Sequence, residues 1–474
     1  MARANRSPAK KKAARPRAKA GPPRKTEVSQ LLAEWRARGI RRAKIGGFDL
    51  DGVLRGKYVS LEKLESALDA GFGFCDVIFG WDVADALYDN AKVTGWHTAY
   101  PDICAVLDPT TARYLPWEPD TVGLLCDFRD AAGGPHPACP RSLLQRVTER
   151  LAGSGFEACV GVEFEFFFFR ETRASIDQKG FRGLEPLDPG MFGYSWVRSG
   201  QDSELMHAIL DGMEALDVPI EGLHTETGPG VYEAAIRWDR PLRAADNAAL
   251  FKAALKQIAH QRGLAVTFMA KWNADLPGCS GHLHASLWKD GKNAFFDPKR
   301  ERSMSLVMQR FIAGQVALMQ ELTALFSPTV NSYKRYVPGV WAPLLASWGE
   351  ENRTAAVRVI GLGNPKAQRI EYRQTAADIN PYVAIAGCLG AGLWGIEKKL
   401  SLPAEAHGDA GTEGPLRLPR TLREATQALS TSPVARDLFG EAFVDHYVRT
   451  RDWECRAYEA AVTDWELRRY FEVI

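Results

Sequence analysis

The feature that most constrains this chain is a tight turn between two acidic residues, within residues 222–236, which read GLHTETGPGVYEAAI. Glu226 and Glu233 flank a Thr-Gly-Pro-Gly stretch that cannot continue a helix. The turn allows both carboxylates to converge on one point. Converging carboxylates repel each other unless a cation or a proton lies between them, and Mg²⁺ and Mn²⁺ prefer such oxygen ligands. The turn therefore predicts a divalent-cation site or a solvated acidic loop, and the rest of the chain favours the first.

A second pair of acidic residues lies in residues 158–170, which read ACVGVEFEFFFFR and predict a β-strand. Because side chains alternate along a strand, Glu163 and Glu165 share one face, roughly 7 Å apart. Two carboxylates in such an apolar strand are costly unless they are neutralised. The alternative is an edge strand whose glutamates face water.

Residues 281–288, GHLHASLW, predict another strand with a polar face and an apolar face. His282, His284 and Ser286 lie on the polar face, which indicates the floor of a site rather than a set of core histidines. Cys279 lies close by, but no second cysteine accompanies it and the other candidate ligands are carboxylates. A structural zinc site is therefore disfavoured.

Basic side chains gather in the segments that follow. They are Arg353, Arg358, Arg369 and Arg373, with Lys334 and Lys366. An ion-pair ladder through Glu371 would explain part of this group, but the number of cations suits an anion that bears carboxylate and phosphate. Carboxylates and histidines that bind cations, together with arginines, are the side chains that catalyse phosphoryl transfer. No GxxxxGK[ST] motif and no GxGxxG after a strand occurs, which argues against P-loop and Rossmann nucleotide sites.

Composition and charge indicate a soluble cytoplasmic protein. The 474 residues are 46% hydrophobic, and the eight cysteines include no CxxC pair, as in proteins of a reducing compartment. The apolar run at 383–396 is too short to span a bilayer and predicts a buried helix. Residues 1–25 hold ten lysines or arginines and no acid. A solvated tail is favoured there over an arm that binds nucleic acid or a membrane surface.

Turn and helix signals divide the chain into a tail and two domains. We expect helices at residues 28–37, 61–70, 141–152 and 443–461, another from residue 422, and a hairpin over 42–59 that turns at Asp51-Gly52. Several short strands should follow, up to residue 127. The loop at 130–140, DAAGGPHPACP, predicts a domain boundary. The expected parts are a basic tail at 1–26, an N-terminal domain at 27–138 and a larger catalytic domain at 139–474.

In their order and spacing, six segments resemble the glutamine synthetase family, including its γ-glutamyl-amine ligase branch. They read GVEFEFF, HTETGPGVYE, SGHLHASLW, NSYKRYVPG, WGEENRTAAVRV and RIEYR followed by NPY. The likeness runs from about residue 27 to the C-terminus. It implies an α+β fold: a small β-grasp-like domain, then a catalytic α/β domain with an antiparallel sheet. It also implies a homo-oligomer of two stacked rings, a dodecamer, in which a neighbour completes each site.

The resemblance implies a role for each candidate residue. One metal position takes Glu165, Glu226 and Glu233, and a second takes Glu163, His282 and Glu371. Glu221, His284, Ser286, Lys366 and Arg369 match positions that hold ATP. Arg335, Arg353, Arg358 and Arg373 match those that grip the glutamate and the transferring phosphate. Asp49 matches an aspartate that a neighbouring subunit contributes to the amine site. Tyr194 matches an aromatic residue in the wall of that site, and Gly278 matches a backbone position that binds glutamate. ATP and two or three Mg²⁺ or Mn²⁺ ions are the implied cofactors.

The chain departs from the family pattern in a flap after NSYKR. Ammonia-using members read PGYEAP there, and their glutamate completes the pocket that binds ammonium and removes its proton. This chain reads PGVWAP, which places Trp341 at that position. An indole cannot accept a proton at neutral pH, and it offers an apolar, π-rich face instead. The alternative is that Trp341 only fills the flap while another acid serves as base.

The sequence thus predicts an ATP-dependent ligase that forms a γ-glutamyl amide from glutamate and an organic amine, a polyamine or a monoamine. A γ-glutamyl phosphate would be the intermediate. Two alternatives stay open: a glutamine synthetase that uses ammonium, and a catalytically silent family member with a structural or regulatory role. All six matched metal positions are intact, which favours an active enzyme.

Overall fold

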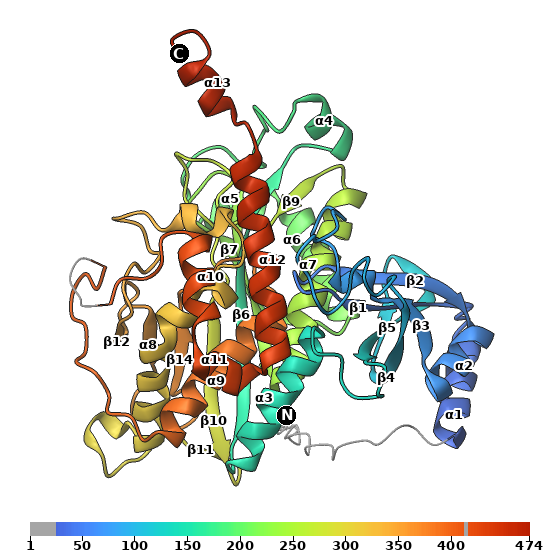
Figure 1. The fold of residues 1–474 in the computed structure, drawn as a ribbon, viewed down its shortest axis with the longest axis horizontal. Coiled ribbons are helices and arrows are strands. Elements are labelled where there is room, and N and C mark those ends of the chain that lie inside the picture. Colours follow the sequence, from blue (N-terminus) through green and yellow to red (C-terminus); the bar gives the residue numbers. More distant parts are fainter. Residues whose placement is uncertain (1–24, 412–415) are drawn as a thin grey trace, which may run out of the picture.

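The computed structural model describes residues 25–411 and 416–474, so the predicted tail lies almost wholly outside the described residues. Its N-terminal part is a five-stranded sheet with two helices, shown in blue in Figure 1. The elements are α1 (Lys25–Ala37), β1 (Arg42–Phe48), β2 (Leu54–Ser60), α2 (Leu61–Ala70), β3 (Phe72–Cys75), β4 (Asp102–Leu115) and β5 (Glu118–Arg129). The strand order is β2-β1-β5-β4-β3, with β1 parallel to β5 and the other neighbours antiparallel. The mixed sheet is observed, whereas its β-grasp-like classification stays a prediction.

The predicted hairpin and the two helices beside it are confirmed, but the expectation of several short strands up to residue 127 is wrong. That region holds the short β3 and two long strands, β4 and β5. The pairing of β4 with β5 shifts register between Asp108 and Arg113, where Asp108 accepts a hydrogen bond from the Thr110 backbone amide. This irregularity interrupts the alternation of apolar and polar residues along the strand. The sequence of one long strand therefore resembles that of several short strands.

The larger part of the chain is built on a second sheet, which carries most of the predicted site. Its strands are β6 (Glu157–Phe169), β7 (Ile220–Thr225), β8 (Val231–Asp239), β9 (Ala265–Thr267), β10 (Leu283–Lys289), β11 (Lys292–Asn293), β12 (Trp348–Glu350), β13 (Val357–Ile360) and β14 (Arg369–Tyr372). The main order is β12-β13-β14-β10-β6-β8-β7, and every neighbouring pair is antiparallel except β12 with β13. β6 lies inside the sheet, so the alternative of an edge strand with solvated glutamates is wrong.

The larger part of the chain also contains helices, several of which pack against this sheet. They are α3 (Pro140–Gly153), α4 (Arg173–Gln178), α5 (Trp196–Gln201), α6 (Ser203–Ala215), α7 (Pro241–Gln261), α8 (Leu306–Phe326), α9 (Pro381–Glu397), α10 (Leu422–Ser430), α11 (Pro433–Phe439), α12 (Glu441–Ala460) and α13 (Asp464–Tyr470). Three short 3₁₀ segments are Asp76–Phe79, Glu301–Ser303 and Asn331–Arg335. α9 is buried along most of its length, which confirms the prediction for residues 383–396. None of the helices in the described ranges is long and apolar enough to cross a membrane.

α9 and α8 approach so closely that their contact requires glycine. A Cβ at Gly395 would lie 2.1 Å from the carbonyl oxygen of Arg310, and a Cβ at Gly314 would lie 2.2 Å from that of Ala391. Any larger residue would separate the two helices. This packing fixes the position of α9, whose N-terminal Asn380 holds the β1–β2 turn through hydrogen bonds to the carbonyl oxygens of Asp49 and Leu50, both 3.1 Å long.

Two hydrophobic cores, one for each sheet, are joined by buried ion pairs. The side chain of Arg141 on α3 binds Asp108 at 2.7 Å, Asp127 at 2.9 Å and Asp246 at 2.9 Å. Arg141 is buried, and its charge is compensated by carboxylates from both parts of the chain. These contacts fix the N-terminal sheet against the larger part. The exact domain boundary near residue 138 stays a prediction.

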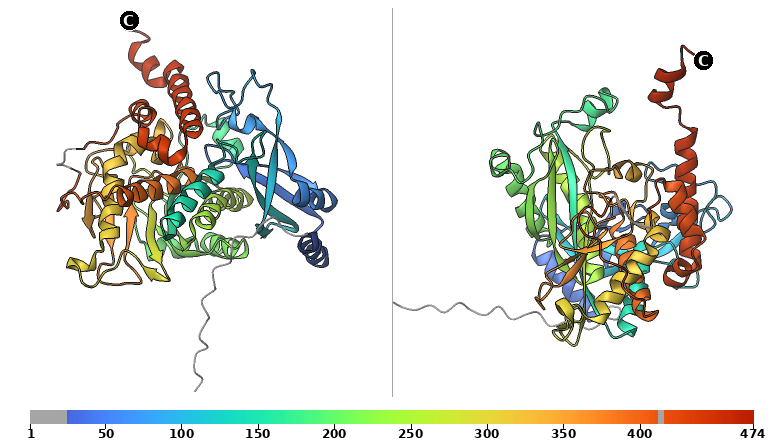
Figure 2. Two further views of the ribbon diagram at one scale, coloured as in Figure 1. Left: turned by 60° about the horizontal axis from the view of Figure 1, so that its bottom comes forward. Right: turned by 90° about the vertical axis from the view of Figure 1, so that its left-hand side faces the viewer.

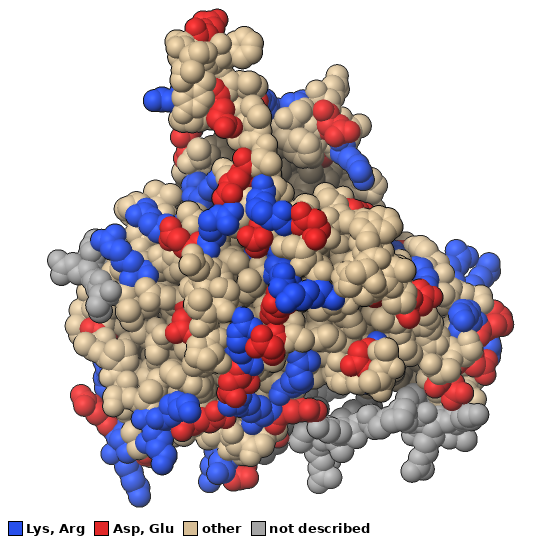
Figure 3. All heavy atoms as spheres, in the orientation of Figure 1, with Lys and Arg blue, Asp and Glu red and all other residues tan. Residues whose placement is uncertain are grey.

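The C-terminal helix α13 projects away from the body of the molecule in both Figure 1 and Figure 2. Among its charged residues and in the segment that follows it, several apolar side chains are exposed, with Trp465 at 59%, Phe471 at 81% and Ile474 at 94%. An exposed apolar segment of this kind is typical of a protein–protein contact. On the face of the body shown in Figure 3, basic and acidic side chains alternate, and neither sign forms a continuous field.

We expect the folded protein to lose stability as the pH falls from about 6.5 towards 4, because two buried histidines are neutral in the folded state. Burial lowers the pKa of both His136 and His446 to about 4 from an ordinary value of 6.5. The unfolded chain therefore takes up protons at a higher pH than the folded chain. The loss should reach roughly 2–3 kcal/mol for each histidine at pH 4.

Thermal unfolding between pH 7 and pH 5, compared between the wild type and His446→Gln, measures this effect. His446→Gln should show a flatter dependence of melting temperature on pH. Equal slopes for the two proteins would contradict the prediction.

Candidate active site

The pairing of the strands places three candidate ligands in a row across the second sheet. His224 on β7 pairs with Glu233 on β8, and Glu233 pairs in turn with Glu165 on β6. Directly paired residues on neighbouring strands point to the same face of a sheet, at about 5 Å separation. The turn at 227–230 then returns Glu226 to this row. The predicted convergence of Glu226 and Glu233 is thus built into the register of β7 and β8.

A second row joins β10, β14 and β13. His284 pairs with Glu371, and Glu371 pairs with Arg358. Glu163 on β6 completes this group, because its Oε1 lies 3.0 Å from Nε2 of His284. Nδ1 of His282 lies 3.3 Å from Oε1 of Glu371. The two rows meet at β6, which carries both Glu163 and Glu165.

Among the described residues there are three groups of side chains, and within each group the ligand atoms lie within 4.8 Å of one another. The groups are Glu163, His284 and Glu371; Glu163, Glu233 and His282; and His224, Glu226 and Glu233. Carboxylate oxygens with one imidazole nitrogen at such separations fit Mg²⁺ or Mn²⁺. Cations held by these residues would neutralise the charge that develops on a transferring phosphate.

The grouping differs from the predicted metal positions in three ways. His284, a predicted ATP-binding residue, is grouped with Glu163 and Glu371 in place of His282, which is grouped with Glu163 and Glu233. Glu165 lies outside the three groups, and its Oε2 accepts a 2.7 Å hydrogen bond from the backbone amide of Ser280. His224, which the sequence reasoning missed, lies inside one of them. Glu163 and Glu233 each belong to two groups and could serve two neighbouring positions.

The electrostatics of these carboxylates divide them into two kinds. Burial alone would raise the pKa of Glu163 and of Glu371, but neighbouring histidines hold both pKa values below the ordinary range, that of Glu371 at about 2. Arg373 adds to the effect on Glu371. Burial, together with the adjacent carboxylates of Glu233 and Glu226, raises the pKa of Glu165 to about 7 against the opposing effect of His282. The raised pKa of Glu165 indicates that carboxylates crowd together in the first row, as expected of a cation site.

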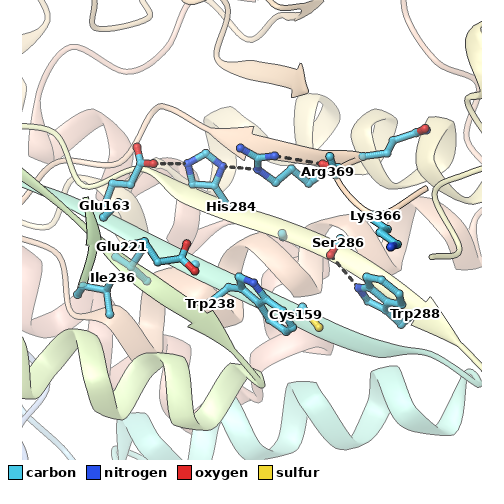
Figure 4. A pocket seen from close by; sticks show the side chains of 16 residues that line it. Cys159, Glu163, Glu221, Ile236, Trp238, His284, Ser286, Trp288, Lys366 and Arg369 are labelled. Carbon is cyan, nitrogen blue, oxygen red and sulfur yellow. Dashed lines mark hydrogen bonds and ion pairs between the residues drawn. The ribbon is translucent and has the colours of Figure 1, made fainter. Parts of the chain in front are cut away.

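A cavity of about 560 Å³ opens beside the second row. All five predicted ATP-binding side chains line it: Glu221, His284, Ser286, Lys366 and Arg369. In Figure 4 Glu163, His284 and Arg369 form a line of interactions, and Ser286, Lys366 and Trp288 lie at the opposite end from Glu163. Arg369 donates to Nδ1 of His284 over 3.1 Å. The cavity thus joins the cation groups to an end that carries Ser286, Lys366 and Trp288.

Two tryptophans in this cavity were not predicted. They are Trp238 and Trp288, and the indole N–H of Trp288 donates a 2.9 Å hydrogen bond to Ser286. Flat aromatic faces near a polar hydroxyl suit a planar heterocycle such as a nucleotide base. A cavity of this size and lining can hold a nucleotide whose phosphates face the cation groups.

The family comparison decides what kind of site this is. The family model described as "Glutamine synthetase, catalytic domain" matches residues 137–470. The chain belongs to the glutamine synthetase family. It is accordingly an ATP-dependent ligase that forms carbon–nitrogen bonds from glutamate, and its α+β fold is that of this family. Members of the family use ATP and divalent metal ions and are oligomeric.

The relatives include a protein named as a glutamine synthetase and two proteins named for an organic amine or its amide. The chain is 48% identical over 438 residues to "Type-1 glutamine synthetase 2" of Dictyostelium discoideum, covering 91% of this chain and 84% of the relative. It is 39% identical to "Gamma-glutamylethanolamide synthetase GlnA4" of Streptomyces coelicolor, covering 94% and 96%. It is 38% identical to "Glutamate--isopropylamine ligase" of a Pseudomonas species, covering 92% and 96%. The solved structure "Apo GmaS without ligand" superposes with a TM-score of 0.81 at 29% identity, covering 93% of this chain and 99% of that one.

In this member of the glutamine synthetase family, the candidate arginines are held by the site itself. Arg358 binds Glu371 at 3.1 Å, Arg373 binds the same carboxylate, and Nε of Arg373 donates to the carbonyl oxygen of Arg353 over 3.0 Å. Arg369, in contrast, faces His284, so the expected ladder through Glu371 is formed by Arg358 and Arg373 instead. Arrival of a phosphate or a carboxylate would offer these guanidiniums a second anion.

Arg335 and Gly278 lie against each other next to this arginine group. Arg335 is buried and donates 2.9 Å hydrogen bonds to the carbonyl oxygen of Gln374 and to Oγ of Ser280. A Cβ at Gly278 would lie 2.5 Å from the carbonyl oxygen of Ala270 and 2.9 Å from Cβ of Arg335. Position 278 must therefore be glycine for the backbone to run this close to Arg335. The substrate role of both residues stays a prediction.

Three further candidates lie at the edges of the site. Tyr194 has a positive φ of 54° and is 71% exposed, and its ring stacks on His224 with centroids 4.4 Å apart. Trp341 is 66% exposed and makes no hydrogen bond or ring contact with the described residues. Asp49 is buried within the β1–β2 turn, where it accepts hydrogen bonds from the backbone amides of Asp51 and Val53 and from Arg55. The structure thus brings Tyr194 to the cation groups, and it shows no contact of Asp49 with the other candidate site residues.

Proposed function

We propose that this enzyme joins glutamate to an organic amine, a polyamine or a monoamine, in preference to ammonium. The γ-phosphoryl group of ATP passes to the γ-carboxylate of glutamate and forms γ-glutamyl phosphate and ADP. The amine nitrogen then attacks the carbonyl carbon, phosphate leaves, and the nitrogen loses a proton. The observation that carries this proposal is Trp341, whose exposed indole stands where ammonia-using members place a glutamate.

The geometry supports a separate role for each group of residues in the site. Trp238 and Trp288 hold the nucleotide base, and the phosphates lie toward Glu163 and Arg369. The side chains of Arg335, Arg353, Arg358 and Arg373 grip the glutamate and stabilise the charge of the transferring phosphate. Tyr194 forms one wall of the amine site beside the cation groups. The role of Asp49 in a neighbour's amine site is supported by the resemblance alone, because three donors of the β1–β2 hairpin already hold its carboxylate.

The proposed assembly is a homo-oligomer of two stacked rings, a dodecamer, in the cytoplasm. The exposed apolar side chains of the projecting helix α13 support association, since a monomer would leave Trp465 and Phe471 in water. The names of the relatives from Streptomyces and Pseudomonas support an amine acceptor. The name of the relative from Dictyostelium favours the second candidate, a glutamine synthetase that uses ammonium.

We expect at least one organic amine to exceed ammonium in kcat/KM by about tenfold or more, because a hydrophobic acceptor site gains from each buried methylene. The measurement is phosphate release with ATP, Mg²⁺, glutamate and one acceptor at a time: ammonium, ethanolamine, isopropylamine, putrescine or spermidine. Mass spectrometry of the γ-glutamyl product identifies the amide. Ammonium with a kcat/KM equal to or above that of every amine would contradict the proposal.

A further inference from the structure

His224 has no role among the predicted metal ligands, yet it lies directly beside two of them. Its Nε2 is 3.2 Å from Oε1 of Glu233, and its Nδ1 is 3.9 Å from Oε1 of Glu226. All three side chains offer ligand atoms within 4.8 Å of one another. The pairing of β7 with β8 places His224 opposite Glu233 in the sheet, so the contact follows from the fold rather than from a mobile side chain.

The hydrogen bonding of the imidazole indicates which nitrogen faces the carboxylates with a lone pair. Nδ1 lies 3.2 Å from the carbonyl oxygen of Thr225, which can only accept a hydrogen bond, so the proton of a neutral ring lies on Nδ1. Nε2 then presents a lone pair to a carboxylate oxygen. Two lone pairs at 3.2 Å repel each other unless a cation or a proton lies between them. A histidine whose other ring nitrogen donates to a backbone carbonyl is the usual arrangement of a metal ligand.

The distance fits a shared ion. Two ligand atoms that bind one ion at about 2.1 Å and at a right angle to each other lie about 3 Å apart. The 3.2 Å between Nε2 of His224 and Oε1 of Glu233 is close to this separation. The stacked ring of Tyr194, 4.4 Å away, covers one face of the imidazole and limits its rotation. The nitrogen is therefore held in place before any ion arrives.

We propose that Nε2 of His224 is a ligand of the cation held by Glu226 and Glu233. This position would then have a mixed nitrogen and oxygen ligand set rather than carboxylates alone. Imidazole nitrogen binds first-row transition metals better than Mg²⁺, so His224 should favour Mn²⁺ over Mg²⁺ at this position. The competing explanation is that His224 is protonated and forms an ion pair with Glu233 without contacting an ion.

The test is Mn²⁺ binding to the intact, assembled protein without ATP, glutamate or amine, so its result does not depend on which acceptor the enzyme uses. Electron paramagnetic resonance measures the affinity, and electron spin-echo modulation detects nitrogen bound to Mn²⁺. The variants are His224→Gln, His224→Glu and, as a control, His207→Gln, an exposed histidine on α6 outside the three groups. His224→Gln should weaken one Mn²⁺ step about tenfold or more and reduce the nitrogen signal. His207→Gln should match the wild type.

His224→Glu decides between a ligand and a purely structural residue, and it does so even where His224→Gln fails to assemble. A carboxylate at position 224 should restore cation binding and shift the preference from Mn²⁺ toward Mg²⁺. The nitrogen signal of His224→Glu should stay below that of the wild type, as in His224→Gln. Wild-type Mn²⁺ affinity together with an unchanged nitrogen signal in an assembled His224→Gln or His224→Glu protein would overturn the proposal.

Discussion

Replacing Glu163 by glutamine is expected to lower ATP-dependent phosphate release by about a thousandfold or more, since a charge that holds the cations is lost. Glu163 belongs to two of the three ligand groups and lies 3.0 Å from His284. His284 and His282 hold its pKa below the ordinary range despite burial, so it is an anion at every pH at which the enzyme is assayed. Glutamine keeps the size of the side chain but removes this charge.

The matched control is Glu157→Gln, which lies on the same strand β6. Glu157 is exposed and forms an ion pair with Arg240, and it does not line the nucleotide cavity. Loss of the Glu157 charge should leave the rate close to that of the wild type, because an exposed ion pair contributes little to the stability of the fold. Light scattering should show equal assembly of both variants. More than about a tenth of wild-type activity in Glu163→Gln would contradict the two-cation site, as would wild-type activity in EDTA.

The local elements of this fold could be predicted because their signals lie close together in the sequence. Helix α2 runs from Leu61 to Ala70 as expected, since the hydroxyl of Ser60 caps its first turn and Gly71, at φ 73°, ends it. The candidate ligands on β6, and likewise those on β10, could be placed on one face of their strand because side chains along a strand alternate between its two faces. The buried helix α9 followed from its composition and length.

The missing parts of the site depend on pairings that sequence alternation does not reveal. Trp238 lines the cavity and follows a shift in the register of β6 with β8. The shift lies between the pair Val162–Ile236 and the pair Val160–Asp239. Such a shift changes the face of the sheet to which the following side chains point. His224 could have been found, because it lies two positions before Glu226, which directly follows β7, and side chains two apart in an extended chain point to the same side. Its partner Glu233 is on the neighbouring strand, and only the register shows that they meet.

The exchange Trp341→Glu is expected to raise kcat/KM for ammonium by roughly 10- to 100-fold, because a hydrogen bond to a charged group contributes roughly 1.5–3 kcal/mol. A glutamate at this position offers the partner that a small ammonium ion needs and a base for its proton. The same exchange removes the apolar face against which an alkyl chain or ring would pack, so kcat/KM for the preferred amine should fall. The ratio of the two values is therefore the most sensitive measurement.

Two variants of the same loop separate this effect from a general effect of charge. Val340→Glu adds the same carboxylate one position earlier, at a residue that is 43% exposed, and should leave the ratio unchanged. Trp341→Ala removes the indole without adding a base, so it should weaken the amine without helping ammonium. Initial rates with each acceptor at saturating ATP and glutamate give both constants. An unchanged ratio in Trp341→Glu would show that another acid of the assembled site removes the proton and that the indole does not select the acceptor.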